Sequence, residues 1–216
     1  MNKRIHLNPG LVIAFGVAGV IFIGAFLLNL SIASNNGKSI GFLNALFTST
    51  SAVSVTGLVV VNTAQHWTTF GKAVIIVLTQ VGGLGFMTLT TLLALIIKKK
   101  IGLKERLIMQ EQLNQDSFSG IVRLTRFVII FTFTIETIGA LFLSLRFIPI
   151  YGPTKGIVYS IYHSISAFCN AGFDLTGDSL ISFVGDPIIN FTIAGLIIFG
   201  GLGYTVYLDI ARSRNI

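Results

Sequence analysis

The sequence predicts an all-α membrane protein made of two tandem units, each consisting of a helix, a short re-entrant segment and a second helix. Composition is the first observation behind this prediction. Of 216 residues, 53% are hydrophobic and 11% are charged, with a mean hydropathy of +0.84, whereas about one quarter of an average soluble domain is charged. These values exclude an ordinary soluble enzyme and a disordered tail. A disulfide-stapled secreted domain is also excluded, because Cys169 is the only cysteine.

Long apolar stretches are the second observation. A helix must be long enough to cross a hydrocarbon core of about 30 Å, and four stretches meet that length: residues 11–32, 73–97, 127–145 and 188–208. The first stretch follows Lys3 and Arg4, as a signal peptide would. Its apolar run of about 22 residues is longer than a signal h-region, so we expect a retained helix.

The distribution of charge predicts the orientation. Eleven of the 15 basic residues lie near the two termini or between residues 98 and 126, whereas Asp174, Asp178 and Asp186 lie in a different polar stretch. The positive-inside rule then places both termini in the cytoplasm of a multi-pass protein in the cell (plasma) membrane. A nucleic-acid surface is the weaker interpretation of the net charge of +7, so we expect the lipid bilayer and no nucleic acid as partner.

Two semi-apolar segments between the spans are too short to cross the membrane. They cover residues 41–53 and 156–169, on the outer side, and their length fits a re-entrant helix. Backbone that is not helical at membrane depth is tolerated only where it is buried in protein or lines a water-filled path. A re-entrant helix followed by a return to the outside therefore suggests a pore.

An internal repeat is the third observation. Residues 51–58 (SAVSVTGL) align with 166–173 (SAFCNAGF), which pairs Gly57 with Gly172 at a separation of 115. Residues 81–86 (VGGLGF) align with 199–204 (FGGLGY) at a separation of 118. We therefore expect a first unit at 1–100, a cytoplasmic elbow at 101–126 that lies at the interface, and a second unit at 127–216.

The loops after the two re-entrant helices carry the chemistry. Glycine allows backbone conformations in which carbonyl oxygens replace the hydration shell of a permeating cation. The candidate groups are the main-chain carbonyls of Ser54, Val55, Thr56, Gly57, Cys169, Asn170, Ala171 and Gly172. We expect Asp174 and Asp178 to concentrate cations at the outer mouth. The Gly-Gly-x-Gly blocks are more typical of close helix packing than of ion contact.

Three further residues have competing interpretations. Glu136 lies in the middle of the third span, where a carboxylate is costly; it either belongs to a proton or cation path or, more commonly, is protonated or paired with a polar side chain of a neighbouring helix. We expect His163 to be a hydrogen-bonded packing residue and Trp67 to lie in the outer interfacial belt. No histidine or cysteine spacing predicts a resident metal.

These motifs resemble the Trk/Ktr/HKT superfamily of potassium transporters, most closely the N-terminal half of the KtrB-type membrane subunit. The resemblance rests on residues 48–58 and 166–173, on the blocks at 82–85 and 200–203, and on the elbow residues Asn114-Gln115 and 123–126. It implies a potassium-channel-like fold of M1-P-M2 repeats with K⁺ as the transported ion and no covalently bound cofactor. It also implies a homodimer docked on a cytoplasmic KtrA-like nucleotide-binding ring. Glycine rather than serine at position 57 matches the potassium-selective members.

The family places four such repeats around one pore, and this chain carries two. We therefore expect a potassium-conducting subunit, not an enzyme, that supplies half of a pore, either as part of a longer gene product or through assembly of two copies. The alternatives are a non-conducting or assembly-only subunit, a Na⁺-permeable transporter of the same fold, and a membrane enzyme that uses Glu136 and His163.

Overall fold

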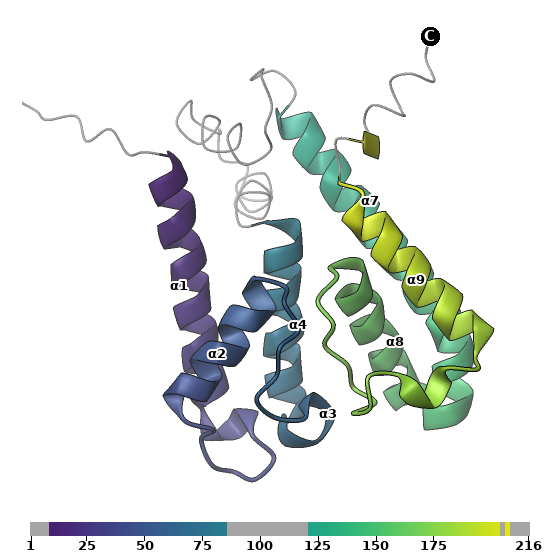
Figure 1. Ribbon diagram of the computed structural model, residues 1–216, viewed down its shortest axis with the longest axis horizontal. Coiled ribbons are helices and arrows are strands. Elements are labelled where there is room, and N and C mark those ends of the chain that lie inside the picture. Colours follow the sequence, from purple (N-terminus) through teal and green to yellow (C-terminus); the bar gives the residue numbers. More distant parts are fainter. Residues whose placement is uncertain (1–8, 86–120, 204–205, 208–216) are drawn as a thin grey trace, which may run out of the picture.

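The computed structural model describes residues 9–85, 121–203 and 206–207, which fold into helices joined by loops. The helices are α1 (Pro9–Asn29), η1 (Ser31–Ala33), α2 (Phe42–Val53), α3 (Thr63–His66), α4 (Thr69–Leu84), α7 (Ile121–Tyr151), α8 (Pro153–Phe168), η2 (Ile181–Phe183) and α9 (Pro187–Gly201). Figure 1 shows α1–α4 gathered on one side and α7–α9 on the other. We call these groups the first and second sides.

On the first side, the short α2 packs against both longer helices, α1 and α4. Thr68 fixes the start of α4, because its Oγ1 accepts a hydrogen bond from the Gly71 N–H (3.2 Å). The same hydroxyl donates to the Ile32 carbonyl (2.8 Å), just beyond the end of α1. One side chain therefore caps α4 and ties it to η1, which follows α1.

On the second side, α7 turns directly into α8. Gly152, between them, has φ = 81°, a conformation that glycine adopts at little cost, and Pro153 occupies the first turn of α8, where its missing N–H is harmless. Asp186 caps α9 by accepting from the Ile188 and Ile189 N–H groups. The helix α8 packs on both α7 and α9.

The described helices fit a membrane protein. One of them, Arg126–Tyr151, is long and apolar enough to cross a bilayer within the described residues. The described parts of α1, α4 and α9 are apolar but shorter, and residues 86–97 of the expected second span lie outside the description. Large apolar side chains face outward, including Phe26 (64% exposed) and Phe191 (79%). Such a surface is typical of contact with lipid.

The helix bounds differ in places from those predicted. The short helices α2 and α8 occupy the two segments expected to be re-entrant. Residues 121–126, expected in the elbow, form the first turns of α7, because the helical backbone begins at Ile121. The remainder of the predicted elbow, 101–120, lies outside the described residues.

The predicted interfacial position of Trp67 is wrong. Its side chain is fully buried, because the backbone of Trp67 pairs with Ser34 and turns the indole toward the start of α4. A Cβ added at Gly71 would lie 2.9 Å from the indole Cε3. Trp67 therefore fills the core beneath η1 and α4.

The two sides meet where α4 packs on α8. At this contact Gly83 faces the Cys169 side chain so closely that an added Cβ would collide with Sγ. One buried apolar cluster also includes residues of both sides, among them Leu28, Trp67, Phe147 and Phe173.

Candidate functional site

The C-terminal end of α2 is closed by backbone hydrogen bonds. The Val55 N–H donates to the Ala52 carbonyl (3.3 Å), and the Thr56 N–H donates to the Ser51 carbonyl (3.0 Å). Val55 has φ = 57°, in the left-handed region. This is the Schellman pattern, which usually carries glycine at that position. A β-branched residue there is strained, so the loop conformation is imposed by its surroundings.

The end of α8 has the same arrangement, 115 residues later. The Asn170 N–H donates to the Ala167 carbonyl (3.0 Å), and the Ala171 N–H donates to the Ser166 carbonyl (2.8 Å). Asn170 has φ = 59°; asparagine tolerates this region better than valine. Both short helices therefore end at the same kind of turn.

The loops that follow meet at two glycines. Gly57 (φ = 72°) and Gly172 (φ = 74°) are both left-handed. A Cβ added at Gly57 would collide with the Ala171 carbonyl oxygen, and one added at Gly172 would lie 3.8 Å from the Gly57 Cα. Position 57 therefore requires glycine for two reasons, backbone conformation and space.

The main-chain carbonyls around these glycines are unpaired. Within the described part of the chain, no carbonyl of residues 54–57 or 169–172 accepts a hydrogen bond. Apart from Ala171, these residues are half-buried or exposed, so the oxygens of the two adjoining loops are accessible to a cation or to water. Both loops are braced by equivalent serines: Ser51 Oγ accepts from Thr56 Oγ1 (3.0 Å), and Ser166 Oγ donates to the Phe173 carbonyl (2.6 Å).

The glycine-rich blocks lie behind the loops. A Cβ at Gly82 would collide with the Val53 carbonyl oxygen, and one at Gly200 would collide with the Phe168 carbonyl oxygen. These carbonyls belong to the last residues of α2 and α8. The glycines therefore let α4 and α9 approach the ends of the short helices, which is a packing role.

Glu136 connects the two sides of the molecule. Its side chain is 5% exposed, and its Oε1 accepts a hydrogen bond from Gln80 Nε2 of α4 (2.9 Å). Its backbone carbonyl accepts from Ser164 Oγ of α8 (2.6 Å). Of the two interpretations of Glu136, the structure therefore supports pairing with a neighbouring helix.

His163 supports the second loop from behind. Its Nε2 accepts a hydrogen bond from the Leu175 N–H (3.2 Å), so Nδ1 carries the proton and donates to the Tyr159 carbonyl (2.7 Å). The ring is 2% exposed. The expected packing role of His163 is confirmed, with the additional finding that it anchors the chain beyond Gly172.

Comparison with known proteins adds to this geometry. The family described as "TrkH: Cation transport protein" matches residues 16–216. The chain belongs to the TrkH cation transport family. It is thus related to membrane transport proteins rather than to enzymes, as predicted.

Among curated relatives of this TrkH-family chain are two bacterial uptake proteins. It is 47% identical to "Ktr system potassium uptake protein B" of Bacillus subtilis, covering 99% of this chain and 47% of the relative. It is 45% identical to "Potassium/sodium uptake protein NtpJ" of Enterococcus hirae, covering 100% of this chain and 48% of the relative. The predicted KtrB-type membership is confirmed, and the chain spans about half the length of these relatives.

The acidic residues expected at the outer mouth are held in the loop after Gly172. The Asp174 carboxylate accepts from the Thr176 hydroxyl (2.7 Å) and the Gly177 N–H (2.6 Å). Asp178 accepts from the hydroxyl and N–H of Ser182. Hydrogen bonds, the Ser182 hydroxyl foremost, lower the pKa of Asp178 to about 2. Both side chains order the loop, and Asp178 is ionised at neutral pH.

Two contacts of this TrkH-family chain were missed by sequence reasoning. Gln80 was not singled out as the partner of Glu136, although a polar side chain within a span is itself a signal. Asn62 Nδ2 donates to the Gly177 carbonyl (3.0 Å), which links the outer loops of the two sides. No local sequence pattern predicts that hydrogen bond, because its two partners are 115 residues apart.

Proposed function

We propose that this chain supplies two M1-P-M2 units of a potassium uptake pore, in which carbonyls of residues 54–57 and 169–172 coordinate the ion. One observation carries the proposal: two loops with unpaired carbonyls, each following a short helix closed in the same way, meet at Gly57 and Gly172. Carbonyl oxygens at close quarters replace water around a dehydrating cation. Transported K⁺ is also what the name of the Bacillus subtilis relative implies.

The repeat organisation is supported by matched contacts. Ser49 Oγ donates to the Ile21 carbonyl (2.7 Å), as Ser164 Oγ donates to that of Glu136 (2.6 Å). A Cβ at Gly24 would meet Leu78 at 2.6 Å, and one at Gly139 would meet Leu196 at 2.7 Å. The positions differ by the repeat offsets of 115 or 118. In each unit the first helix therefore packs on its short helix and its last helix through the same positions.

A shared axis follows from the contact between equivalent residues. When two units are related by rotation, equivalent atoms touch only close to the rotation axis. Gly57 and Gly172 are equivalent, and a Cβ added to either would lie within 3.3–3.8 Å of the Cα of the other. We infer that the pore axis passes beside this pair, with Asp174 and Asp178 on the side from which cations enter.

Two loops supply half of the carbonyl groups that a fourfold ion site requires. We propose that two further loops complete it, from the remainder of a longer gene product or from a second copy. The family resemblance extends the proposal to a homodimer with cytoplasmic termini that docks on a KtrA-like nucleotide-binding ring.

The test uses the complete gene product that contains residues 1–216, expressed in bacteria deficient in potassium uptake. Gly57→Ser adds a Cβ where the Ala171 carbonyl lies, so we expect preference for K⁺ over Na⁺ to fall at least tenfold, equivalent to about 1.4 kcal/mol. Gly19→Ser is the matched control, because an added Cβ there meets nothing within 4 Å. Unchanged ion preference in a normally inserted Gly57→Ser protein refutes the filter assignment.

Sodium permeation is a second candidate, favoured by the name "Potassium/sodium uptake protein" of the Enterococcus hirae relative. Competition between radioactive sodium and unlabelled potassium in the same cells separates the two. Sodium uptake that resists excess potassium favours this candidate, and complete suppression favours the potassium assignment.

A further inference from the structure

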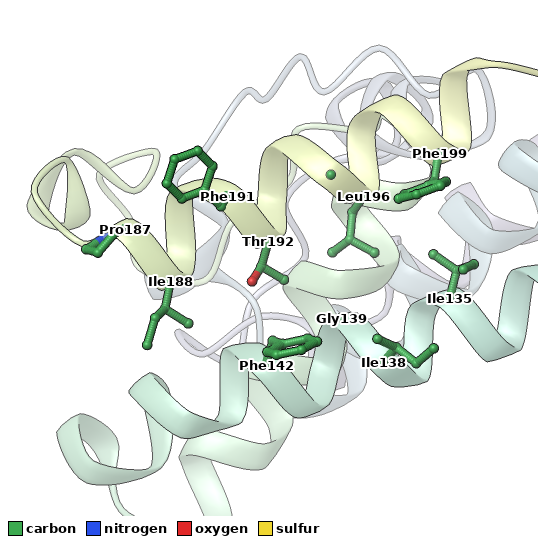
Figure 2. Close-up of a pocket in the computed structure, with 11 residues that line it drawn as sticks. Ile135, Ile138, Gly139, Phe142, Pro187, Ile188, Phe191, Thr192, Leu196 and Phe199 are labelled. Carbon is green, nitrogen blue, oxygen red and sulfur yellow. The ribbon is translucent and has the colours of Figure 1, made fainter.

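An apolar groove runs between α7 and α9 (Figure 2), and no residue of the candidate ion site lines it. Its volume is about 480 Å³, within the range of about 300–1,000 Å³ typical of small-molecule sites. Ile135, Gly139 and Phe142 line it from α7, and Ile188, Gly195 and Phe199 line it from α9. A groove of this composition suits a hydrocarbon chain.

The length of the groove matches one leaflet of a bilayer. Ile135 lies near one end, and Arg146 follows Phe142 by about one helical turn at the other. The lining residues of α9 run from Pro187 to Phe199, a rise of about 18 Å along an α-helix. This is roughly half of a hydrocarbon core of about 30 Å.

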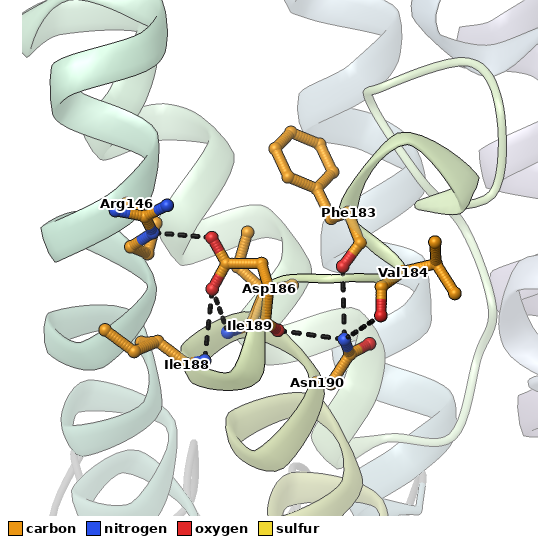
Figure 3. Close-up of polar contacts among 7 residues, drawn as sticks. All are labelled: Arg146, Phe183, Val184, Asp186, Ile188, Ile189 and Asn190. Atoms are coloured by element: carbon orange, nitrogen blue, oxygen red, sulfur yellow. Dashed lines mark hydrogen bonds and ion pairs between the residues drawn. The ribbon is translucent and has the colours of Figure 1, made fainter.

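The end of the groove near Arg146 presents an exposed guanidinium group that is paired on one side with a buried carboxylate. Asp186, which precedes the lining residues of α9, uses one carboxylate oxygen on Arg146 Nε (2.5 Å) and the other on the Ile188 and Ile189 N–H groups (Figure 3). Its side chain is 8% exposed, whereas that of Arg146 is 45% exposed. The carboxylate is thus engaged and buried, and the guanidinium faces outward. An exposed guanidinium suits a phosphate group.

The exposed face of α4 indicates that a following unit would leave the groove face of α9 uncovered, because α4 and α9 are equivalent helices and α4 already has a unit beside it. Val77 of α4 corresponds to Gly195 of α9 at the offset of 118, and it stays 59% exposed although the second side is present. The contact between the two sides uses Gln80 and Gly83 instead. Gly195 lines the groove, and a Cβ there would meet nothing within 4 Å, so a larger side chain at this position would occupy open space in the groove.

We propose that this groove binds a phospholipid, with an acyl chain along α7 and α9 and the phosphate beside Arg146. The proposal needs only that the chain lies in a membrane, and it does not depend on ion conduction. The lipid would brace the outer ends of α7 and α9, the two helices that hold α8.

The test measures lipid retention by native mass spectrometry of the complete gene product in detergent, with added phosphatidylglycerol. Gly195→Val places a larger side chain in the groove; valine is the residue at the equivalent position, 77, of α4. We expect it to reduce retained phospholipid about tenfold, whereas Gly19→Val, at an exposed position of α1, leaves it unchanged. Arg146→Gln should remove the preference for phosphatidylglycerol over diacylglycerol, which lacks the phosphate.

Three results overturn the proposal. Equal retention by Gly195→Val and the parent protein means that the lipid binds elsewhere. A change of oligomer mass in Gly195→Val, without loss of lipid, assigns the groove to a protein partner. Equal binding of phosphatidylglycerol and diacylglycerol by the parent protein removes the role of Arg146. Potassium uptake, measured separately, tests the proposed function and leaves these results unaffected.

Discussion

Removal of the Glu136 carboxyl tests how the two sides of the molecule are held together. In Glu136→Leu, Gln80 Nε2 loses its acceptor, and Gln80 Oε1 already has no hydrogen-bond partner within the described residues. An unsatisfied buried polar group costs about 1–3 kcal/mol, but hydrogen bonds between membrane helices average only about 0.6 kcal/mol, with a maximum near 1.7. We therefore expect a destabilisation of about 1 kcal/mol, a factor of about 5 in the folded-to-unfolded ratio.

A double-mutant cycle isolates this bond. The variants are Glu136→Leu, Gln80→Leu and the pair together, and the measurement is the free energy of unfolding in mixed detergent micelles. Glu136→Gln keeps a side-chain oxygen that can accept the hydrogen bond from Gln80 Nε2, so its free energy of unfolding should match that of the parent protein. Thr137→Val is the control, because among the described residues that exposed hydroxyl bonds only to the Phe133 carbonyl of its own helix. A coupling energy near zero refutes the bridging role.

Glu136→Gln also separates the two interpretations of this residue in function. If the carboxyl belongs to a proton or cation path, its neutral isostere abolishes potassium uptake. If Glu136 acts by joining α4 to α7, Glu136→Gln sustains uptake and Glu136→Leu weakens it. Loss of uptake in Glu136→Gln with unchanged stability contradicts our interpretation.

The remaining predictions concern packing and the outer loop. Gly200→Ala places a methyl group on the Phe168 carbonyl and should destabilise by about 1–3 kcal/mol, whereas Gly195→Ala, in open space, should not; equal melting temperatures would contradict this. Asp186→Ala removes the α9 cap and should lower the melting temperature more than Asp186→Asn, which keeps a capping oxygen; because both variants lose the ion pair with Arg146, an equal fall in melting temperature would show that the cap contributes little and the ion pair dominates. Because the pKa of Asp178 is lowered to about 2, its stabilising effect is present above an unfolded pKa of about 3.9 and is lost as the pH falls toward 2. Thermal stability of Asp178→Asn relative to the parent protein should therefore be constant from pH 5 to 8 and converge in acid, and a difference that changes near neutrality would rule out this assignment.

Local patterns were sufficient for the secondary structure and for the family. Uninterrupted apolar runs indicate helices, because the backbone in a bilayer must satisfy its own hydrogen bonds. The short lengths of the segments around Val53 and Phe168 indicated helices too short to span, and α2 and α8 end at those residues. The aligned glycines indicated loops of one kind, because left-handed backbone favours glycine.

Some local predictions failed where several segments meet. Trp67 was assigned to the interface from its amphipathic ring, yet its pairing with Ser34, 33 residues earlier, turns it inward. The left-handed Val55 also has no local signal, because valine disfavours that conformation and only the surrounding packing imposes it.

Residue patterns along the chain indicated which described segments are helical, which are apolar and which turns need glycine, because these properties depend on neighbours a few residues away. The contacts between distant segments emerged with the folded chain: Gly57 against the Ala171 carbonyl, Gln80 against Glu136, and the groove between α7 and α9 that Gly195 lines. These contacts could not be predicted from local patterns, because close packing depends on the shapes of side chains brought together from distant positions in the sequence.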